Sequence, residues 1–192
     1  RTEAESRNEY AFLYFEADEL EIDWEHVLEG TEGYRDWYYE TQVAYMREIP
    51  EFYTKVPEED LPRLAQLCGE NPAGTPEEAT AFILSVLQEN MTYTQTPGLF
   101  PFNEDPVEYF LFEGREGYCQ HFASAAVLMY RLYGIPARYA TGYAVTPSMF
   151  TEQADGTWAA EVTDEAAHAW AEIFQEDYGW VPVEVTPSGN GG

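Results

Sequence analysis

Apolar side chains recur every three or four residues in the middle of the chain, which is the period of a helix with one buried face. One such stripe is formed by Phe82, Ile83, Val86 and Leu87. Just before it, Thr75-Pro76-Glu77-Glu78 combines a threonine N-cap, a proline at the first helical position and a glutamate three residues after the cap. This is the sequence of a capping box, and it predicts a helix to about Asn90 that packs against the core. Asp105-Pro106-Val107-Glu108 repeats the capping pattern and predicts a short helix through about Phe112.

The next stripe begins at Cys119, directly after the glycines Gly114 and Gly117. Its apolar positions are Phe122, Ala125, Ala126, Met129 and Leu132. Gly134 and the following Ile135-Pro136 supply a C-terminal stop. Because the alanines and the serine in this segment allow neighbouring elements to approach closely, we expect this helix to be central and largely buried.

After this helix the pattern changes to the period of two that is typical of strands. We predict strands at residues 137–145, 157–162, 167–174 and 180–185, with turns such as Asp155-Gly156 and Asp177-Tyr178-Gly179 between them. Residues from about 9 to 70 are predicted to be mainly helical, and the clearest internal break lies at residues 69–74. Helices followed by antiparallel strands indicate an α+β fold with a helix laid across the sheet. We predict a helical region at residues 1–72 that packs on a core formed by residues 73–192.

The charge of the chain limits its partners. Its 9 basic and 36 acidic residues give a net charge of −27 over 192 residues, which repels nucleic acid and anionic lipid surfaces. The acidic residues are spread along the chain, so we expect most of them to form a solvated face. No apolar run is long enough to span a bilayer, and we expect no direct membrane insertion of this piece. The start at Arg1 and the polar end at residues 189–192 indicate a piece of a longer protein.

The two cysteines, Cys68 and Cys119, are too few for a disulfide framework. Helical spacing around Cys68 predicts a small buried apolar residue. A zinc site built from Cys68, Cys119, His121 and His168 lacks the usual ligand spacing, and no calcium-loop motif is present. We therefore expect no metal and no cofactor.

Cys119 lies where a thiol can become a nucleophile. The N-terminus of a helix offers unpaired N–H groups and a partial positive charge, which favour the thiolate and can hold an oxyanion. His168 lies on one predicted strand, and Glu184 lies on the next, across a hairpin turn near Asp177. The period of two places His168, Trp170 and Glu172 on one face of the strand. Glu184 should then lie within one register step of the imidazole.

Each of these residues also has a purely structural explanation. Cys119 could be a buried filler, His168 a hydrogen-bonded core residue and Glu184 the solvent face of an edge strand. The order Cys, His, carboxylate favours thiol chemistry, in which the imidazole moves the proton and the carboxylate fixes the ring orientation. The oxyanion would be met by the Cys119 backbone N–H and a second donor, a Tyr or Trp side chain. Sequence leaves open whether a bulge or the sheet edge brings His168 to the helix.

Four ordered blocks of sequence resemble the transglutaminase-like superfamily, within the papain-like group of thiol enzymes. They are residues 114–126, 134–143, 168–173 and 178–187. The resemblance implies Cys119 as the nucleophile, His168 as the general base and Glu184 at the third position, where the family usually has Asp. It gives His121 no catalytic role, because two residues along a helix turn a side chain by roughly 200°. Arg138 and Tyr143 are expected to pack or to shape the groove, and Trp170 and Trp180 to wall it.

The resemblance implies an enzyme that acts on amide bonds through a thioester, either by hydrolysis of a peptide or isopeptide or by acyl transfer to an amine. The substrate would be a protein or peptide, basic or amine-bearing given the acidic surface. Bacterial members of this kind are often extracytoplasmic parts of membrane proteins, so a membrane-anchored parent chain at the cell surface is expected. The alternative is a non-catalytic binding or assembly module, and Glu184 in place of Asp is its main support.

Overall fold

The computed structural model describes residues 32–176 and 178–187, and the fold is α+β as predicted. The chain divides into two compact units. One contains residues 49–143 and 167–187 of the described chain, and the other contains the described residues before 49 together with 144–166. The predicted helical segment before residue 32, the turn residue Asp177 and the polar tail from residue 188 lie outside the described residues. The predicted division at residue 72 remains a prediction about domain organisation.

The larger unit carries a three-stranded antiparallel sheet in the order β3-β6-β7. Its strands are β3 (Ala137–Tyr143), β6 (Ala167–Gln175) and β7 (Gly179–Val183). β3 pairs with β6 along its whole length, from Ala137 opposite Ile173 to Tyr143 opposite Ala167. β7 pairs only with the second half of β6, from Ala171 opposite Val183 to Gln175 opposite Gly179. The first half of β6 therefore extends beyond the end of β7.

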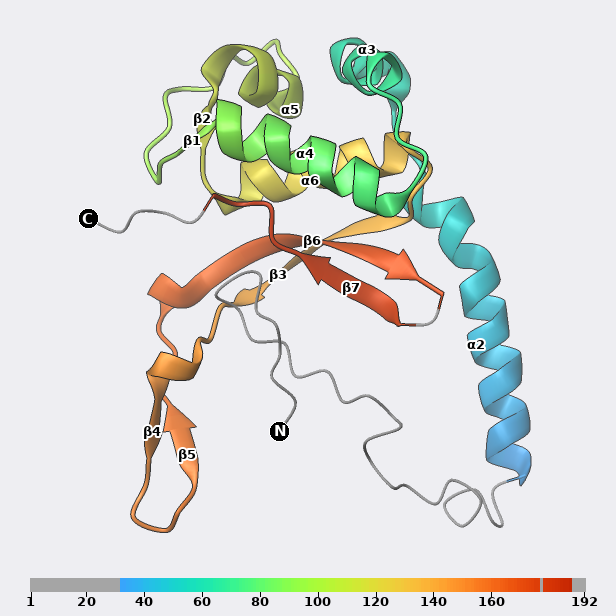
Figure 1. Cartoon of the computed structure of the whole chain (residues 1–192), viewed down its shortest axis with the longest axis vertical. Coiled ribbons are helices and arrows are strands. Elements are labelled where there is room, and N and C mark those ends of the chain that lie inside the picture. Colours follow the sequence, from blue (N-terminus) through green and yellow to red (C-terminus); the bar gives the residue numbers. More distant parts are fainter. Residues whose placement is uncertain (1–31, 177, 188–192) are drawn as a thin grey trace. The chain divides into compact units, whose positions relative to one another are not determined.

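Helices cover one face of this sheet (Figure 1). α6 (Cys119–Leu132) packs against β6 and β3, and α3 (Pro62–Glu70), α4 (Pro76–Asn90) and α5 (Pro106–Tyr109) pack around α6. The two long predicted helices are thus confirmed, and α6 is central as expected. Its fully buried side chains include Phe122, Ala125, Ala126, Met129 and Tyr130, and Ala169, Ala171 and Ile173 of β6 are buried as well. Cys68 on α3 is buried in the same core, as predicted.

The local signals at the helix ends act as the sequence indicates, with one difference. The Thr75 hydroxyl accepts the Glu78 N–H at 3.2 Å, but the Glu78 carboxylate accepts the N–H of Gly74 and not that of Thr75. α5 is followed by a single π-helical turn, η2 (Phe110–Gly114), which the sequence pattern did not predict. Arg115 then takes a left-handed conformation with φ of 52°. A two-residue parallel ladder, β1 (Thr92–Tyr93) with β2 (Glu116–Gly117), was also missed because it is too short to show a period.

The smaller unit contains the first part of α2 (Glu32–Tyr53) and a hairpin of β4 (Phe150–Glu152) and β5 (Trp158–Ala160). Phe150 lies opposite Ala160, and the turn between the strands contains Gly156 with φ of +82°. The short 3₁₀ turns η3 (Pro147–Met149) and η4 (Asp164–Ala166) flank this hairpin. The strand predicted at residues 157–162 is therefore shorter than expected, and its partner β4 was not predicted.

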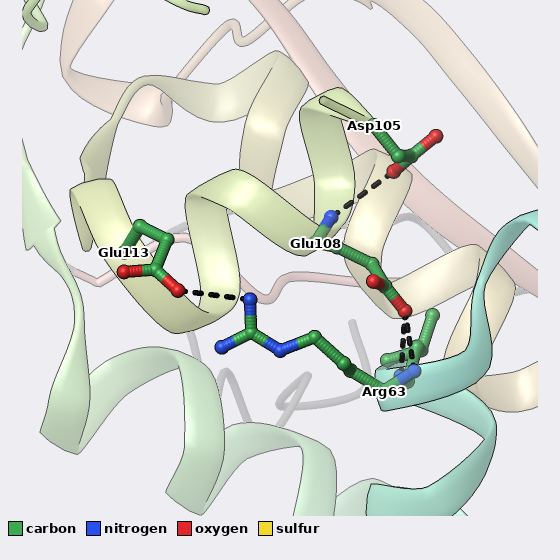
Figure 2. A network of polar contacts seen from close by, with 5 residues as sticks. Arg63, Asp105, Glu108 and Glu113 are labelled. Atoms are coloured by element: carbon green, nitrogen blue, oxygen red, sulfur yellow. Dashed lines mark hydrogen bonds and ion pairs between the residues drawn. The ribbon is translucent and has the colours of Figure 1, made fainter. Parts of the chain in front are cut away.

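A buried carboxylate joins α5 to α3. Leu61, at the N-cap of α3, has no side-chain acceptor, and the Glu108 Oε1 atom accepts the N–H groups of Arg63 and Leu64 at 2.7 and 2.9 Å (Figure 2). Glu108 is itself held by Asp105, which caps α5 by accepting the Glu108 N–H at 3.0 Å. Glu108 is only 9% exposed. The first turn of α3 is thus capped by a residue 44 positions later in the chain.

We predict that Glu108→Ala lowers the free energy of unfolding by roughly 3 kcal/mol, because it leaves two backbone donors, one buried and one partly buried, without an acceptor. Glu108→Gln keeps an acceptor oxygen and should cost clearly less. Urea denaturation followed by circular dichroism measures both values. The control is Glu113→Gln, which removes an ion pair between Glu113 and Arg63 that is about half exposed and should change stability by less than about 1 kcal/mol. Equal effects of Glu108→Ala and Glu113→Gln would contradict the capping role.

Candidate active site

Cys119 is the first residue of α6, with Tyr118 as the extended N-cap residue before it. The Tyr118 carbonyl accepts the N–H groups of His121 and Phe122, so the helix begins in regular geometry. The approach to Cys119 is fixed by β2, because the Gly117 carbonyl accepts the Thr94 N–H at 2.7 Å. The Cys119 side chain is neither fully buried nor fully exposed. It is therefore accessible at the mouth of a helix, as the sequence predicted.

The sheet brings His168 and Glu184 together. The imidazole Nε2 atom lies 2.6 Å from the Glu184 Oε2 atom, and the two side chains are only 13% and 10% exposed. Glu184 directly follows β7, and His168 lies three residues before the first β6 residue that pairs with β7. The predicted neighbourhood of these two residues across the hairpin is thus observed. The sequence left open whether a bulge or the sheet edge brings His168 to the helix. In the structure His168 lies at an edge, because β7 ends before it reaches this part of β6.

Glu184 is itself oriented by the backbone that follows it. Its second oxygen, Oε1, accepts the N–H of Thr186 at 2.8 Å. Both carboxylate oxygens therefore have a protein donor, and the side chain is held in one orientation. The longer side chain at the position where Asp was expected reaches the imidazole without losing this second contact.

Three groups favour the charged form of the Cys119 sulfur. A hydrogen bond with the His168 ring is the largest influence and lowers the pKa of the Cys119 thiol, whereas burial raises it. The backbone N–H groups of Ala169 and Gln120 and the charge on His168 lower this pKa further. Because the Nε2 atom of His168 binds Glu184, the Nδ1 atom is the one left for the sulfur. The Gln120 N–H belongs to the unpaired donors of the first helical turn. The sulfur is thus stabilised as a thiolate from both the helix and the sheet.

The imidazole is stabilised in the complementary form. Burial alone would lower the pKa of His168, but its hydrogen bonds with Cys119 and Glu184, together with their charges, raise that pKa to about 9. At neutral pH the geometry therefore favours a thiolate–imidazolium pair, with the Glu184 carboxylate behind the imidazolium.

The face of the sheet around His168 is built from aromatic and charged side chains. The Trp170 ring stacks beside the His168 ring at 6.2 Å, and its Nε1–H donates to Glu172 Oε1 at 3.1 Å. The Arg138 Nε atom lies 2.6 Å from the other Glu172 oxygen, and its guanidinium lies over the Trp180 ring at 4.3 Å. Gly142 on β3 leaves space for Trp170, because a Cβ there would lie 2.9 Å from the ring. These contacts fix the ring that packs beside the imidazole.

Sequence reasoning did not predict that two further residues, Tyr139 and His121, lie near the sulfur. Tyr139 lies on β3 opposite Ala171, on the face of the sheet that α6 covers, and is 40% exposed. Burial and the nearby charges of Cys119 and Tyr118 raise the pKa of Tyr139. His121 does not join His168 and Glu184, as expected, but its Nδ1 atom accepts the Tyr118 N–H at 3.3 Å. The alternation of β3 could have suggested Tyr139, and the position three residues after the N-cap could have suggested His121.

Cys68 has the opposite environment to Cys119. It is 4% exposed, and burial raises the pKa of its thiol to about 11 despite a hydrogen bond with Tyr133. The described residues contain no group of three or more His, Cys, Asp or Glu side chains placed to hold a metal ion. Cys119 is therefore the thiol that this arrangement prepares for reaction.

The sequence model of the transglutaminase-like superfamily matches residues 65–185. The match covers more than half of the chain, and the chain belongs to this superfamily. Over 85 residues the chain is 42% identical to the uncharacterized protein YebA of Bacillus subtilis strain 168, across 44% of this chain and 11% of that protein. Over 116 residues it is 34% identical to a protein-glutamine gamma-glutamyltransferase of Pseudomonas aeruginosa, across 55% of this chain and 15% of that protein. The chain thus matches a small part of the length of these relatives.

A solved structure shares the fold. The crystal structure of the periplasmic domain of TgpA from Pseudomonas aeruginosa superposes with a TM-score of 0.61 and 30% identity, over 72% of this chain and 47% of that one. The structure of that domain bound to ethylmercury gives the same TM-score at 29% identity, over 72% of this chain and 49% of that one. The described part of this chain has no helix with the length and hydropathy needed to cross a bilayer.

We predict that iodoacetamide alkylates Cys119 with a midpoint below pH 8.5, the approximate pKa of an ordinary thiol. His168→Ala should move this midpoint upward, because the largest influence that lowers the pKa of Cys119 is its hydrogen bond with His168. Mass spectrometry of the alkylated peptides separates the two cysteines, and Cys68 is the internal control that should stay unmodified in the folded protein. An ordinary midpoint for Cys119 in the unaltered protein would contradict the thiolate–imidazolium pair.

Proposed function

We propose that this chain is a cysteine-dependent enzyme acting on amide bonds, with Cys119 as the nucleophile, His168 as the general acid and base, and Glu184 as the group that orients His168. The observation that carries the proposal is the chain of contacts from the sulfur to the imidazole and from the imidazole Nε2 atom to Glu184 Oε2 at 2.6 Å. A nucleophile, a base within hydrogen-bonding reach and a third group orienting the base are the pattern of covalent catalysis. Membership of the transglutaminase-like superfamily supports the same assignment.

The reaction follows from these roles in two halves. The Cys119 thiolate attacks the carbonyl carbon, a C–S bond forms and the carbonyl oxygen becomes an oxyanion. When this intermediate collapses, the C–N bond breaks and the His168 imidazolium gives its proton to the leaving amine, which leaves a thioester. Neutral His168 then takes a proton from water or an incoming amine. The oxygen or nitrogen bonds to the acyl carbon, the C–S bond breaks and the thiolate re-forms.

The oxyanion needs donors close to the sulfur. The Cys119 backbone N–H at the helix N-terminus is one, and we assign the phenol of Tyr139 as the second. Tyr139 is supported by its place on the α6-facing side of β3, opposite Ala171 and two register positions from the Thr141–Ala169 pair. Its partial exposure leaves it accessible to a substrate, and it lies close enough to Cys119 to respond to the charge on the sulfur.

The acyl acceptor is proposed to be an amine, with a glutamine side chain as the acyl donor. A protein-glutamine gamma-glutamyltransferase is among the relatives, and a surface of net charge −27 attracts cationic amines and basic peptides. We also propose an extracytoplasmic location in a longer, membrane-anchored parent protein. The similarity to a periplasmic domain and the small fraction of the relatives' length that this chain covers support it.

The test is incubation with a glutamine-containing peptide, with and without a primary amine such as a lysine-containing peptide. We predict ammonia release in both cases and an isopeptide product only with the amine, and loss of both in Cys119→Ala. Turnover should fall as the pH rises through about 9, because His168 then loses the proton that the leaving amine requires. Mass spectrometry of the product and of the acylated enzyme measures each step.

The outcomes separate the candidate functions. Water as the sole acceptor, with no isopeptide formed, would assign hydrolysis instead of transfer. The chain and its longer parent protein could both fail to react with glutamine peptides and with general peptide substrates, and leave Cys119 without an acyl group. This result would favour a non-catalytic binding or assembly module. The matched control is Cys68→Ala, which removes the buried thiol and should leave turnover per folded molecule unchanged.

We predict that Tyr139→Phe lowers kcat by about 10²-fold, the effect of removing one oxyanion donor, while KM changes little. Phe keeps the ring and its packing but lacks the O–H group. Tyr143→Phe is the matched control, because Tyr143 lies on the same strand and is more exposed. Steady-state kinetics with the best substrate from the panel measures both constants. An unchanged kcat, or an equal loss in both variants, would remove Tyr139 from the oxyanion site.

A further inference from the structure

His121 occupies an unusual place for a histidine, at the third residue of α6 and in contact with the backbone that precedes Cys119. In a capping box this position is held by Glu or Gln, whose side chain accepts the N–H of the N-cap residue. Here the His121 Nδ1 atom makes that contact, with the Tyr118 N–H at 3.3 Å. A short polar chain is thus replaced by a rigid ring.

The ring is fixed on several sides. It meets the Tyr118 ring edge to face at 4.5 Å, and the Phe110 ring of η2 lies at 5.6 Å. It also lies directly against Gly117, where a Cβ would come within 2.8 Å of the imidazole Cγ atom. Gly117 is held from its other side by the Thr94 N–H, which donates to its carbonyl. The peptide leading into Cys119 is therefore clamped between β1 and the His121 ring.

We propose that His121 is a positioning residue for Cys119: as a neutral ring accepting the Tyr118 N–H, it fixes the first turn of α6 so that the Gln120 N–H points at the sulfur. This inference rests on the proposed function, because it concerns the same nucleophile. The contacts of His121 are with Tyr118, Phe110 and Gly117, so it acts on Cys119 through the backbone. Its effect on the sulfur comes through the direction of the first-turn N–H groups.

The protonation state of His121 matters for this role. Only an unprotonated Nδ1 atom can accept the Tyr118 N–H; a protonated ring would turn a donor toward a donor. Burial lowers the pKa of His121 and outweighs the backbone contact with Tyr118, which acts in the opposite direction, so the ring is neutral at physiological pH. The titratable groups that face the ring are Tyr118 at the N-cap and, across a small cavity on its other side, Tyr109 and Glu116.

The test compares His121→Leu and His121→Gln with the unaltered protein, using the pH dependence of Cys119 alkylation by iodoacetamide. Leu fills space but accepts no hydrogen bond, whereas Gln is the acceptor usual at this position and does not titrate. We expect His121→Leu to slow alkylation at acidic pH about 10-fold, equivalent to a rise of one unit in the pKa of Cys119. The rate of Cys119 alkylation in His121→Gln should stay within about 3-fold of that in the unaltered protein, which corresponds to a change of about half a pKa unit.

The unaltered protein should show an additional inflection below pH 6.5, the ordinary pKa of histidine, where protonation of His121 removes the acceptor. His121→Gln should lack this inflection, and this comparison stands even if His121→Leu fails to fold. Identical profiles for the unaltered protein and His121→Gln, or a His121→Leu variant with an unchanged profile, would overturn the inference. Alkylation needs no substrate, so a failure of acyl transfer would contradict the proposed function without touching this result.

Discussion

The pairing of β6 with β7 stops at Ala171 and Val183, and the geometry of the site depends on this stop. Beyond it, the chain after β7 is free to turn Glu184 toward His168 and to place the Thr186 N–H against the carboxylate. The exposed part of β6 can in turn offer the Ala169 N–H to the sulfur, a donor that a continuing β7 ladder would occupy. A slip of one residue in this register would send His168 to the other face of the sheet. The same edge therefore lets the imidazole meet Glu184 and supplies a donor to the thiolate.

The geometry of the site also depends on close packing between α6 and the sheet. Ala123, Ala125 and Ala126 on the helix and Ala169 and Ala171 on β6 are at most 1% exposed. Small side chains on both surfaces let the two backbones approach, and this distance decides whether the sulfur reaches the imidazole. Larger residues at such positions are destabilising, because a well-packed core cannot absorb added methylenes without moving its elements. The alanine-rich sequence after Cys119 is thus part of the site, although none of these side chains is reactive.

Sequence predicts those parts of the structure that are determined locally or by period. The caps at Thr75 and Asp105, the stripe of α6 and the alternation of β6 are local patterns, and the structure has them. The hairpin register predicted that Glu184 lies within one step of His168, and the two side chains are in contact. The acceptor that Glu108 supplies to α3 and the π-helical turn after α5 depend on packing between distant segments, which no local pattern encodes. His121 was missed for a different reason: its position three residues after the N-cap is a signal, but the capping-box pattern expects a glutamate or glutamine there.

A strongly acidic composition opposes the negative charge of a thiolate, but the strength of this effect depends on distance. At an effective dielectric constant of about 20, two unit charges about 4 Å apart interact with about 4 kcal/mol, whereas exposed charges beyond about 8 Å are largely screened at physiological ionic strength. His168 and two backbone N–H groups act on the sulfur through direct hydrogen bonds, and Glu184 acts on it through His168. The 36 acidic residues are spread along the chain, and no acidic side chain is among the groups that shift the pKa of Cys119. The net charge therefore influences which partners approach the site, while the thiolate is set by its nearest neighbours.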